Sequence, residues 1–346
     1  MTIDALLTTI ADRRAEFTAL RDLPREVMDE FRQAGIYRAA TPQMFGGDAL
    51  PPAEFLRLVE RIAEVDGSAG WMAAIEVAKI YLTALPLETQ AELYKTGPDI
   101  VFAGALFPLQ PAERVPGGFK ISGRWRFASG CTSADFLAVG IQTDDGPRLA
   151  VLRPEDAEIV ENWDVIGLEG TGSHDLQVNG VVVTDEWTFA RGGRSNVDEP
   201  LYHYPAVPYA AQALAAVNLG IARAALDHVI HIGSVRSGHT GAPRLADRPH
   251  ARITVGKAEA ALRSARAFFY EVTNEVPKQA STIRLAARHA AEVGFEVVRT
   301  AYGLSGIAAI SNDHPLQRYL RDASVVPHHA LLTESVYDEA GSALME

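Results

Sequence analysis

The stretch GGFKISGRWRFASGCTSADFLAVG, residues 117–140, decides the fold. Its first half alternates apolar or aromatic residues with polar ones, which is typical of a β-strand with one buried face. Alternation predicts that Trp125 and Phe127 share one face of this strand and that Arg126 and Ala128 share the other. A Ser-Gly pair then ends the strand.

Turn signals around this strand extend the same pattern over about 100 residues. Residues 115–118 (Val-Pro-Gly-Gly), 144–146 (Asp-Asp-Gly) and 179–180 (Asn-Gly) each separate two apolar runs, as turns between antiparallel strands do. We therefore predict a central antiparallel β domain, a barrel or sandwich, at residues 99–200.

The sequence before this domain has the spacing of helices. Pro24 in a first turn and Gly35 after VMDEFRQA are typical of a helix start and stop. Asp66-Gly67-Ser68 provides a break and a new N-cap. We predict an N-terminal helical domain at residues 1–98.

The sequence after the β domain is rich in alanine and helical over long segments. Small residues let such helices approach closely, so we predict a C-terminal four-helix bundle at residues 201–346. The four expected helices lie at 210–233, 250–272, 282–303 and 314–340.

Composition narrows the classes of function. The 346 residues are 47% hydrophobic and 22% charged, with 32 basic and 44 acidic side chains and a net charge of −12. Without a basic block, nucleic acid is a poor partner. The sequence starts without a signal-peptide pattern and shows no run of about 20 apolar residues, so we expect a cytoplasmic protein that does not bind membranes. The single cysteine, Cys131, favours packing over chemistry.

The usual catalytic motifs are missing. No phosphate-binding GxxxxGK[ST], zinc-binding HExxH or nucleophile GxSxG occurs, and no GxGxxG follows a strand. His328 and His329 are adjacent on a predicted helix and diverge by about 100°, so they do not form one metal site. At most one of them faces the core or a site.

An ordered series of segments resembles the acyl-CoA dehydrogenase superfamily over nearly the whole chain. The resemblance implies an α+β multi-domain fold of N-terminal helices, a β domain and a four-helix bundle. The segments begin at residues 23 (LPREVMDEFRQAGIYRAATPQMFGG), 59 (VERIAEVDGSAGW), 117 (the stretch above), 163 (WDVIGLEGTGSHDLQV), 220 (GIARAALD), 242 (APRLADRPH) and 302 (YGLSGIAAISNDHPLQRYLRDA).

Two chemistries occur in that superfamily, and the catalytic glutamate separates them. The commonest dehydrogenase pattern has a glutamate eight positions after the Arg321-Asp322 pair, where this chain has Ala330. The alternative position, on the first long C-terminal helix, corresponds to Ala210. Abstraction of an α-proton needs a base within hydrogen-bond reach, so an ordinary dehydrogenase is disfavoured. The related hydroxylases have a histidine seven positions after the pair, and here it is His329.

The resemblance therefore implies a flavin-dependent monooxygenase. It would take reduced FMN or FAD from a separate NAD(P)H:flavin reductase and hydroxylate a small aromatic or nitrogen-containing substrate through a C4a-hydroperoxyflavin. His329 would hydrogen-bond the peroxide or deprotonate the substrate. A homotetramer is also implied. The alternatives are an acyl-CoA dehydrogenase-like enzyme with a relocated base, such as Glu76 or Glu334, and a non-enzymatic flavin-fold scaffold.

The strand WRFASG resembles the flavin-facing strand of the family. The resemblance implies cofactor contacts at Trp125, Phe127, Ala128, Ser129 and Gly130, with the Ser129 hydroxyl and backbone amides hydrogen-bonding the N5–O4 edge of the ring. The other interpretation is a central strand that ends in a glycine turn.

The resemblance and the residue types add further candidates. Arg236 stands near the family's phosphate-binding arginine, or is a solvated surface residue. Gly306, with Gly303, resembles a turn near the cofactor, or is a helix C-cap. Candidate substrate contacts are Trp71, Tyr209 and Lys79, and Lys79 stands where many hydroxylases have a histidine.

Overall fold

A computed structural model describes residues 1–235, 243–274 and 280–345. The chain forms two compact units. The sheet unit comprises residues 1–51, 75–165 and 169–207, and the helix unit comprises residues 52–74, 166–168 and 208–346. Along the chain, helices precede and follow the strands of a central sheet, as predicted. The expected domain boundaries at 98 and 200 stay a prediction.

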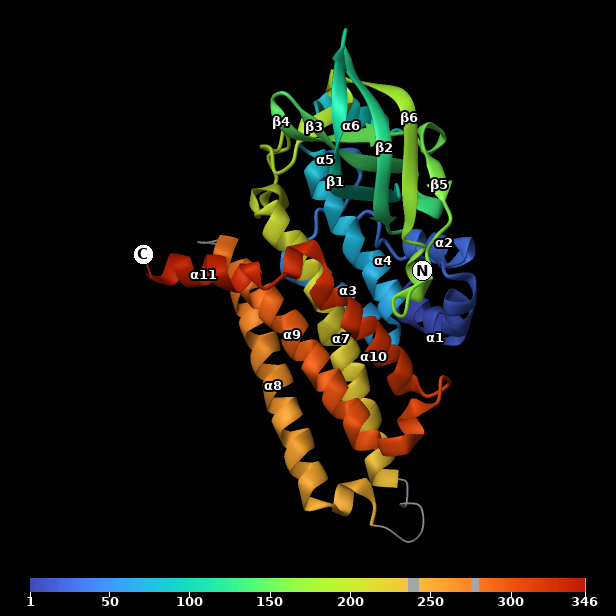
Figure 1. The fold of residues 1–346 in the computed structure, drawn as a ribbon, viewed down its shortest axis with the longest axis vertical. Helices are drawn as coiled ribbons and strands as arrows, with labels where there is room; N and C mark the ends of the chain where they lie inside the picture. Colours follow the sequence, from blue (N-terminus) through green and yellow to red (C-terminus); the bar gives the residue numbers. More distant parts are fainter. Residues whose placement is uncertain (236–242, 275–279, 346) are drawn as a thin grey trace. The chain divides into compact units, whose positions relative to one another are not determined.

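The centre of the sheet unit is a seven-stranded mixed sheet with the order β5-β6-β2-β1-β3-β4-β7 (Figure 1). β1 runs parallel to β3, whereas the other neighbours are antiparallel. The prediction of a purely antiparallel domain is therefore wrong at one pair, because β2 returns beside β1 and places β3 on the other edge of β1. The strands are β1 (Phe102–Val115), β2 (Gly118–Ala128), β3 (Phe136–Thr143), β4 (Gly146–Leu152), β5 (Glu158–Val160), β6 (His174–Thr184) and β7 (Thr188–Ala190).

Two of the three predicted turns join neighbouring strands. Val115 pairs with Gly118 across the β1–β2 turn, and Thr143 pairs with Gly146 across the β3–β4 turn. Asn179-Gly180 is no hairpin, because β6 continues through it. Instead the register of β2 against β6 shifts here, and the amide of Gly180 donates to the Ser122 hydroxyl at 2.9 Å. The Asn-Gly pair therefore marks a bulge.

The sheet unit also contains the first helices. Thr2 caps the first helix by accepting from the Ala5 amide, and Gly35 follows the second helix in a left-handed conformation, as its sequence predicts. These helices are α1 (Ile3–Leu20), α2 (Arg25–Gln33), α5 (Lys79–Leu82) and α6 (Leu87–Leu93).

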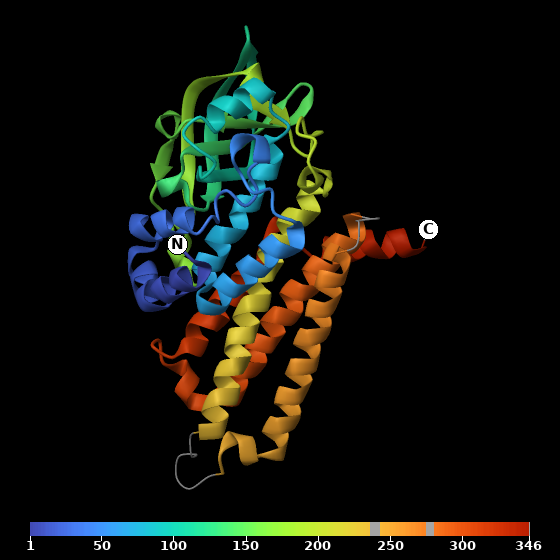
Figure 2. The same cartoon turned by 180° about the vertical axis from the view of Figure 1, so that it is seen from behind.

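The three long helices of the helix unit, within residues 206–305, run alongside one another in both views, whereas the C-terminal helix lies across them (Figures 1 and 2). The fourth predicted C-terminal helix is two helices, because Pro327 has no amide to donate and two short 3-10 turns replace the helix over residues 326–332. The helices are α3 (Pro52–Val65), α4 (Gly67–Ile75), α7 (Ala206–Val235), α8 (Pro249–Asn274), α9 (Ala280–Ser305), α10 (Pro315–Val325) and α11 (Ser335–Met345).

Buried polar side chains of α7 fix the neighbouring helices. Gln212 donates to the Thr273 hydroxyl of α8 at 2.7 Å, and Asn218 donates to the carbonyls of Ala291 on α9 and Ala323 on α10 at 2.8 and 3.2 Å. A buried amide without such partners would cost about 1–3 kcal/mol, so these bonds set the register of α7.

Within residues 1–235, 243–274 and 280–345, two helices are long and apolar enough to cross a membrane by length and composition alone, whereas the sequence led us to expect none. The apolar window in Ala206–Val235 is 72% buried, as in a core helix, and that in Ala280–Ile310 is 28% buried. Alanine gives both helices their hydropathy, and such helices also occur in proteins that do not enter membranes.

Candidate functional site

The end of β2 departs from regular strand geometry. From Trp125 to Ala128 the strand advances three residues while β6 advances two, from Leu176 to His174. The extra residue is Phe127, whose φ of 67° is left-handed. Such a conformation costs a non-glycine residue about 1–3 kcal/mol and is concentrated at functional sites.

This bulge turns the Phe127 ring out of the sheet. The predicted alternation is wrong here, because Trp125 is fully buried whereas Phe127 is 56% exposed. The Phe127 ring meets Trp163 edge-on at 6.2 Å, and the Arg126 guanidinium lies 4.5 Å from its centroid. The result is an exposed aromatic surface suited to a planar ring.

Hydroxyl groups join the end of β2 to residues 171–173. The Ser129 hydroxyl lies 2.7 Å from that of Ser173, which lies 2.7 Å from that of Thr171. The Gly130 amide donates to the Thr171 carbonyl at 2.9 Å. Sequence reasoning missed Thr171 and Ser173, although the T-G-S signal was present in the quoted segment that starts at residue 163. The chain of hydroxyls orients Ser129 as a donor or acceptor.

Two side chains near the bulge belong to the core. The Trp125 indole donates to the Gly140 carbonyl at 2.8 Å. Cys131 is buried, and burial raises the pKa of its thiol to about 12, so the thiol stays protonated. Both side chains fix the loop from inside the sheet unit.

In the helix unit, three of the quoted segments meet at Asp322. Its carboxylate accepts from the Leu168 amide at 2.6 Å. A Cβ on Gly67 would lie 2.9 Å from Asp322 Oδ2, and a Cβ on Gly167 would lie 2.2 Å from the Arg321 carbonyl oxygen. Only glycine permits these approaches. Burial, with a smaller contribution from the nearby carboxylate of Asp66, raises the pKa of Asp322 to about 7.

His329 lies in the helix unit between two 3-10 turns. It is half-buried while His328 is exposed, as expected for one inward-facing histidine, but neither lies within a regular helix. Its Nδ1 accepts from the Leu331 amide at 3.2 Å, so the neutral ring carries its proton on Nε2. The ring meets Trp71 edge-on at 5.8 Å. The structure thus brings together two of the predicted site residues.

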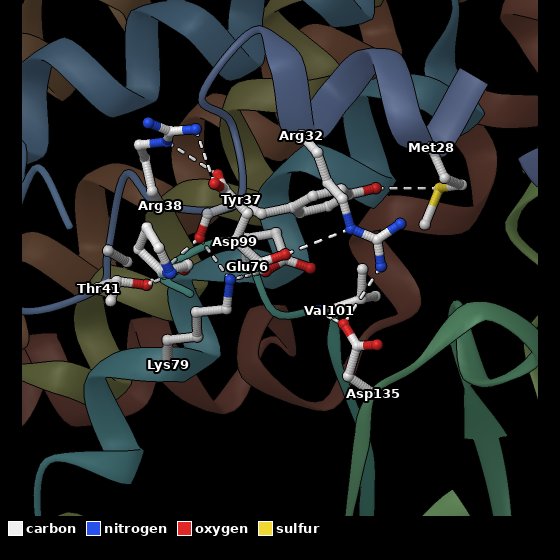
Figure 3. Close-up of polar contacts among 12 residues, drawn as sticks. Met28, Arg32, Tyr37, Arg38, Thr41, Glu76, Lys79, Asp99, Val101 and Asp135 are labelled. Atoms are coloured by element: carbon white, nitrogen blue, oxygen red, sulfur yellow. Dashed lines mark hydrogen bonds and ion pairs between the residues drawn. The ribbon is translucent and has the colours of Figure 1, made fainter. Parts of the chain in front are cut away.

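Lys79 is fully buried in the sheet unit and forms an ion pair with Glu76 at 2.7 Å (Figure 3). Its ammonium also donates to the Tyr37 carbonyl. Burial raises the pKa of Glu76 to about 7, against the opposing effect of Lys79. Burial also lowers the pKa of Lys79. The relocated base Glu76 is therefore engaged with Lys79.

The remaining candidates are Tyr209, Gly306, Glu334 and Arg236. Tyr209 is buried against Phe55 in the helix unit at 6.4 Å. Gly306 follows α9 with a φ of 60°, in the position of a helix C-cap. Glu334 is exposed. Arg236 lies outside the described residues.

Comparison with known proteins identifies the class. Residues 212–334 match the model of the acyl-CoA dehydrogenase C-terminal domain. The crystal structure of the HsaA monooxygenase from Mycobacterium tuberculosis is similar to this chain with a TM-score of 0.92 and 26% identity, and the alignment covers 99% of this chain and 96% of that one. The fold is that of the acyl-CoA dehydrogenases.

Two curated relatives define the family. An indole-3-acetate monooxygenase from Pseudomonas putida is 50% identical, over 98% of this chain and 92% of that protein. The flavin-dependent monooxygenase oxygenase subunit HsaA of Rhodococcus jostii is 29% identical, over 95% and 93%. The chain belongs to the flavin-dependent monooxygenases with the acyl-CoA dehydrogenase fold. It is an oxidoreductase, and its cofactor is reduced flavin.

The end of β2 fits a flavin. The exposed Phe127 ring offers an apolar surface for an isoalloxazine, and the Ser129 hydroxyl offers a hydrogen bond to its polar edge. The left-handed backbone at Phe127 places the ring outside the sheet.

Proposed function

We propose that this chain is the oxygenase component of a two-component system that hydroxylates a small aromatic acid of the indole-3-acetate kind. The exposed Phe127 ring beside the Ser129 hydroxyl chain carries the proposal for the cofactor. The name of the 50%-identical relative supports the substrate class.

In this proposal the β2 end binds the flavin. Phe127 and Ser129 make the side-chain contacts. Ala128 and Gly130 are buried and shape the backbone at this edge, and Trp125 supports it through its hydrogen bond to Gly140. The Ser129 hydroxyl, oriented by Ser173, bonds the polar edge of the ring. A defined orientation of the ring, shielded from solvent, would limit the wasteful reaction in which dioxygen oxidises the flavin and leaves as peroxide.

The bound flavin supplies two electrons, so that one atom of dioxygen enters the substrate and the other leaves as water. His329 manages a proton in this reaction. Because the Leu331 amide donates to Nδ1, the proton of the neutral imidazole is on Nε2, and Nε2–H can donate a hydrogen bond to the reacting oxygen. In this role the imidazole keeps its proton. Trp71 fixes the orientation of the imidazole.

The acyl-CoA dehydrogenase alternative is not favoured. Glu76 is fully buried and paired with Lys79, and Glu334 is exposed on the other unit's surface. Neither carboxylate has the setting of a positioned base.

The proposed function also implies a partner enzyme. A separate NAD(P)H:flavin reductase would supply reduced FMN or FAD, since no nicotinamide fingerprint occurs in the sequence. We further propose that the C-terminal helices form a four-helix bundle that assembles into a cytoplasmic homotetramer.

The test is a single turnover of the full chain with chemically reduced FMN or FAD, indole-3-acetate and ¹⁸O₂. We expect one ¹⁸O atom in the product by mass spectrometry, with less peroxide released than without substrate. Peroxide equal to the flavin oxidised, with no labelled product, would contradict the proposal. Omission of the protein is the control.

A further inference from the structure

A cavity of about 320 Å³ opens on the sheet unit, and its lining includes Gly140, whose carbonyl accepts from the Trp125 indole. Its walls are mostly apolar and come from β1, β3 and β4, with two arginines at its border. The lining includes Leu106, Phe107, Leu109, Leu149, Arg148 and Arg191. The volume is at the lower end of the about 300–1,000 Å³ of small-molecule pockets.

The cavity exists because β1 leaves its ladder. The pairing of β1 with β3 shifts register between Ala105 and Gln110. Gly140 on β3 faces this bulge so closely that a Cβ would lie 2.0 Å from the Leu106 carbonyl oxygen. The bulge leaves the Phe107 ring 52% exposed at the cavity. An aromatic surface is thus built into the wall.

The two arginines are adjacent by register. Arg148 of β4 pairs with Ala190 of β7, and Arg191 is the next residue. Arg148 donates to the hydroxyl and carbonyl of Thr188, both at 3.1 Å. The Arg191 guanidinium lies 5.5 Å from the Phe107 ring centroid, and its buried Nε has no hydrogen-bond partner within the described part of the chain.

Neither arginine has an acidic partner. Most partly buried arginines of this acidic chain form ion pairs, but within residues 1–235, 243–274 and 280–345 no carboxylate lies within 4.0 Å of Arg148 or Arg191. A buried guanidinium donor without an acceptor is costly. The Arg191 side chain as a whole is half-buried, so an anion supplied from outside could bind its terminal nitrogens and provide the missing negative charge.

A second cavity, of about 390 Å³, provides a contrast. It is lined by polar residues that include Arg21 and Asp164, and these two already form an ion pair at 2.8 Å. Arg191 also contacts the Tyr81 ring, at 6.0 Å. Apolar walls beside a guanidinium that has no carboxylate partner occur together only at the first cavity, among the two cavities described.

We propose that the cavity at Phe107 binds the aromatic acid, with the ring against Phe107 and the leucines and the carboxylate against the Arg191 guanidinium. This inference rests on the proposed function for the substrate class. Arginine binds a planar carboxylate through two parallel hydrogen bonds, and Arg148 adds a second positive charge. A phosphate has the same charge chemistry, but the apolar walls favour an aromatic carboxylate.

The test measures binding to the full chain by calorimetry, with indole-3-acetate and with 3-methylindole, which lacks the carboxylate. Arg191→Gln should weaken indole-3-acetate about 10- to 150-fold, the effect of losing a charged hydrogen bond, and leave 3-methylindole within about twofold. Arg191→Lys should recover part of the loss. Arg194→Gln, an exposed arginine outside the cavity, is the matched control and should bind as wild type.

Three results would overturn the inference. If Arg191→Gln weakened the binding of both ligands equally, the cavity would be either purely apolar or misfolded in the variant. Circular dichroism of the variant distinguishes these two cases. Selective loss of reduced FMN binding would assign the guanidinium to a phosphate. Binding of neither ligand to wild type would remove the site. If indole-3-acetate binds through Arg191 but gains no ¹⁸O, the proposed function fails while the site stands.

Discussion

Replacing Lys79 by Met tests the buried ion pair most directly. The substitution keeps the volume and leaves the Glu76 carboxylate without its partner in a fully buried position. Breaking one member of such a pair typically costs about 3–5 kcal/mol. The double variant Lys79→Met/Glu76→Gln removes both charges, so it should recover at least half of this loss.

The stability that Lys79→Met loses should depend on pH, and the raised pKa of Glu76 determines whether the loss grows or shrinks as the pH rises. A carboxyl whose folded pKa is above its unfolded value of about 4.5 contributes stability below pH 4.5 and loses it as pH rises through the folded pKa, which is about 7 in wild type. Without Lys79, burial raises the folded pKa of Glu76 further. The deficit of the variant should therefore widen above pH 7 by up to about 1.4 kcal/mol per pH unit.

The assay is urea unfolding of wild type, both single variants and the double variant at pH 5.5, 7.0 and 8.5, followed by tryptophan fluorescence. Oxidation of reduced flavin by the folded Lys79→Met protein at pH 5.5 should stay within about twofold of wild type, because Lys79 is buried. A Lys79→Met deficit that is below about 1 kcal/mol at pH 8.5, or equal at all three pH values, would refute the reasoning.

Three further predictions concern the proposed site and its supports. His329→Ala should keep flavin binding and shift turnover from product toward peroxide, measured as the product-to-peroxide ratio; an unchanged ratio would exclude the role proposed for the imidazole. Phe127→Gly should relieve about 1 kcal/mol of backbone strain yet weaken the binding of reduced flavin. The free energy of unfolding should therefore rise while the flavin affinity falls; tighter flavin binding would contradict the proposed contact between the Phe127 ring and the flavin. Asp322→Asn removes a carboxyl group whose pKa is raised to about 7. This raised pKa makes the wild type lose stability as the pH rises from about 4 to 7, so the Tm of the variant should fall less over that range. Identical plots of Tm against pH would show that another group is responsible.

The turns show where local sequence suffices. Pro-Gly-Gly at 116–118 and Asp-Asp-Gly at 144–146 were correctly predicted, because these residues suit the left-handed backbone of a tight turn. Asn179-Gly180 has the same local signal, yet it forms a bulge because β2 lies beside both halves of β6. Pairing with a distant strand overrides the turn propensity.

The candidate site likewise contains residues that the sequence indicates and residues that only the packing of distant segments brings together. Ser129 and His329 were found by resemblance, and their partners Ser173 and Trp71 come from distant segments. The outward Phe127 ring could not be predicted, because alternation assumes a regular strand and the bulge adds one residue. Arg191 carried no signal at all, since only the β4–β7 register brings it beside Arg148.

The short segment at residues 166–168 has a consequence for genetic dissection. The chain passes between the two units at residues 51/52, 74/75, 165/166, 168/169 and 207/208. Within the helix unit, the Leu168 amide donates a hydrogen bond to Asp322, which lies far along the chain. No single cut therefore releases either unit with all of its segments. Split-protein fusions and domain swaps would have to be designed around these five crossings, and deletion of residues 166–168 from an otherwise intact chain would remove a piece of the helix unit.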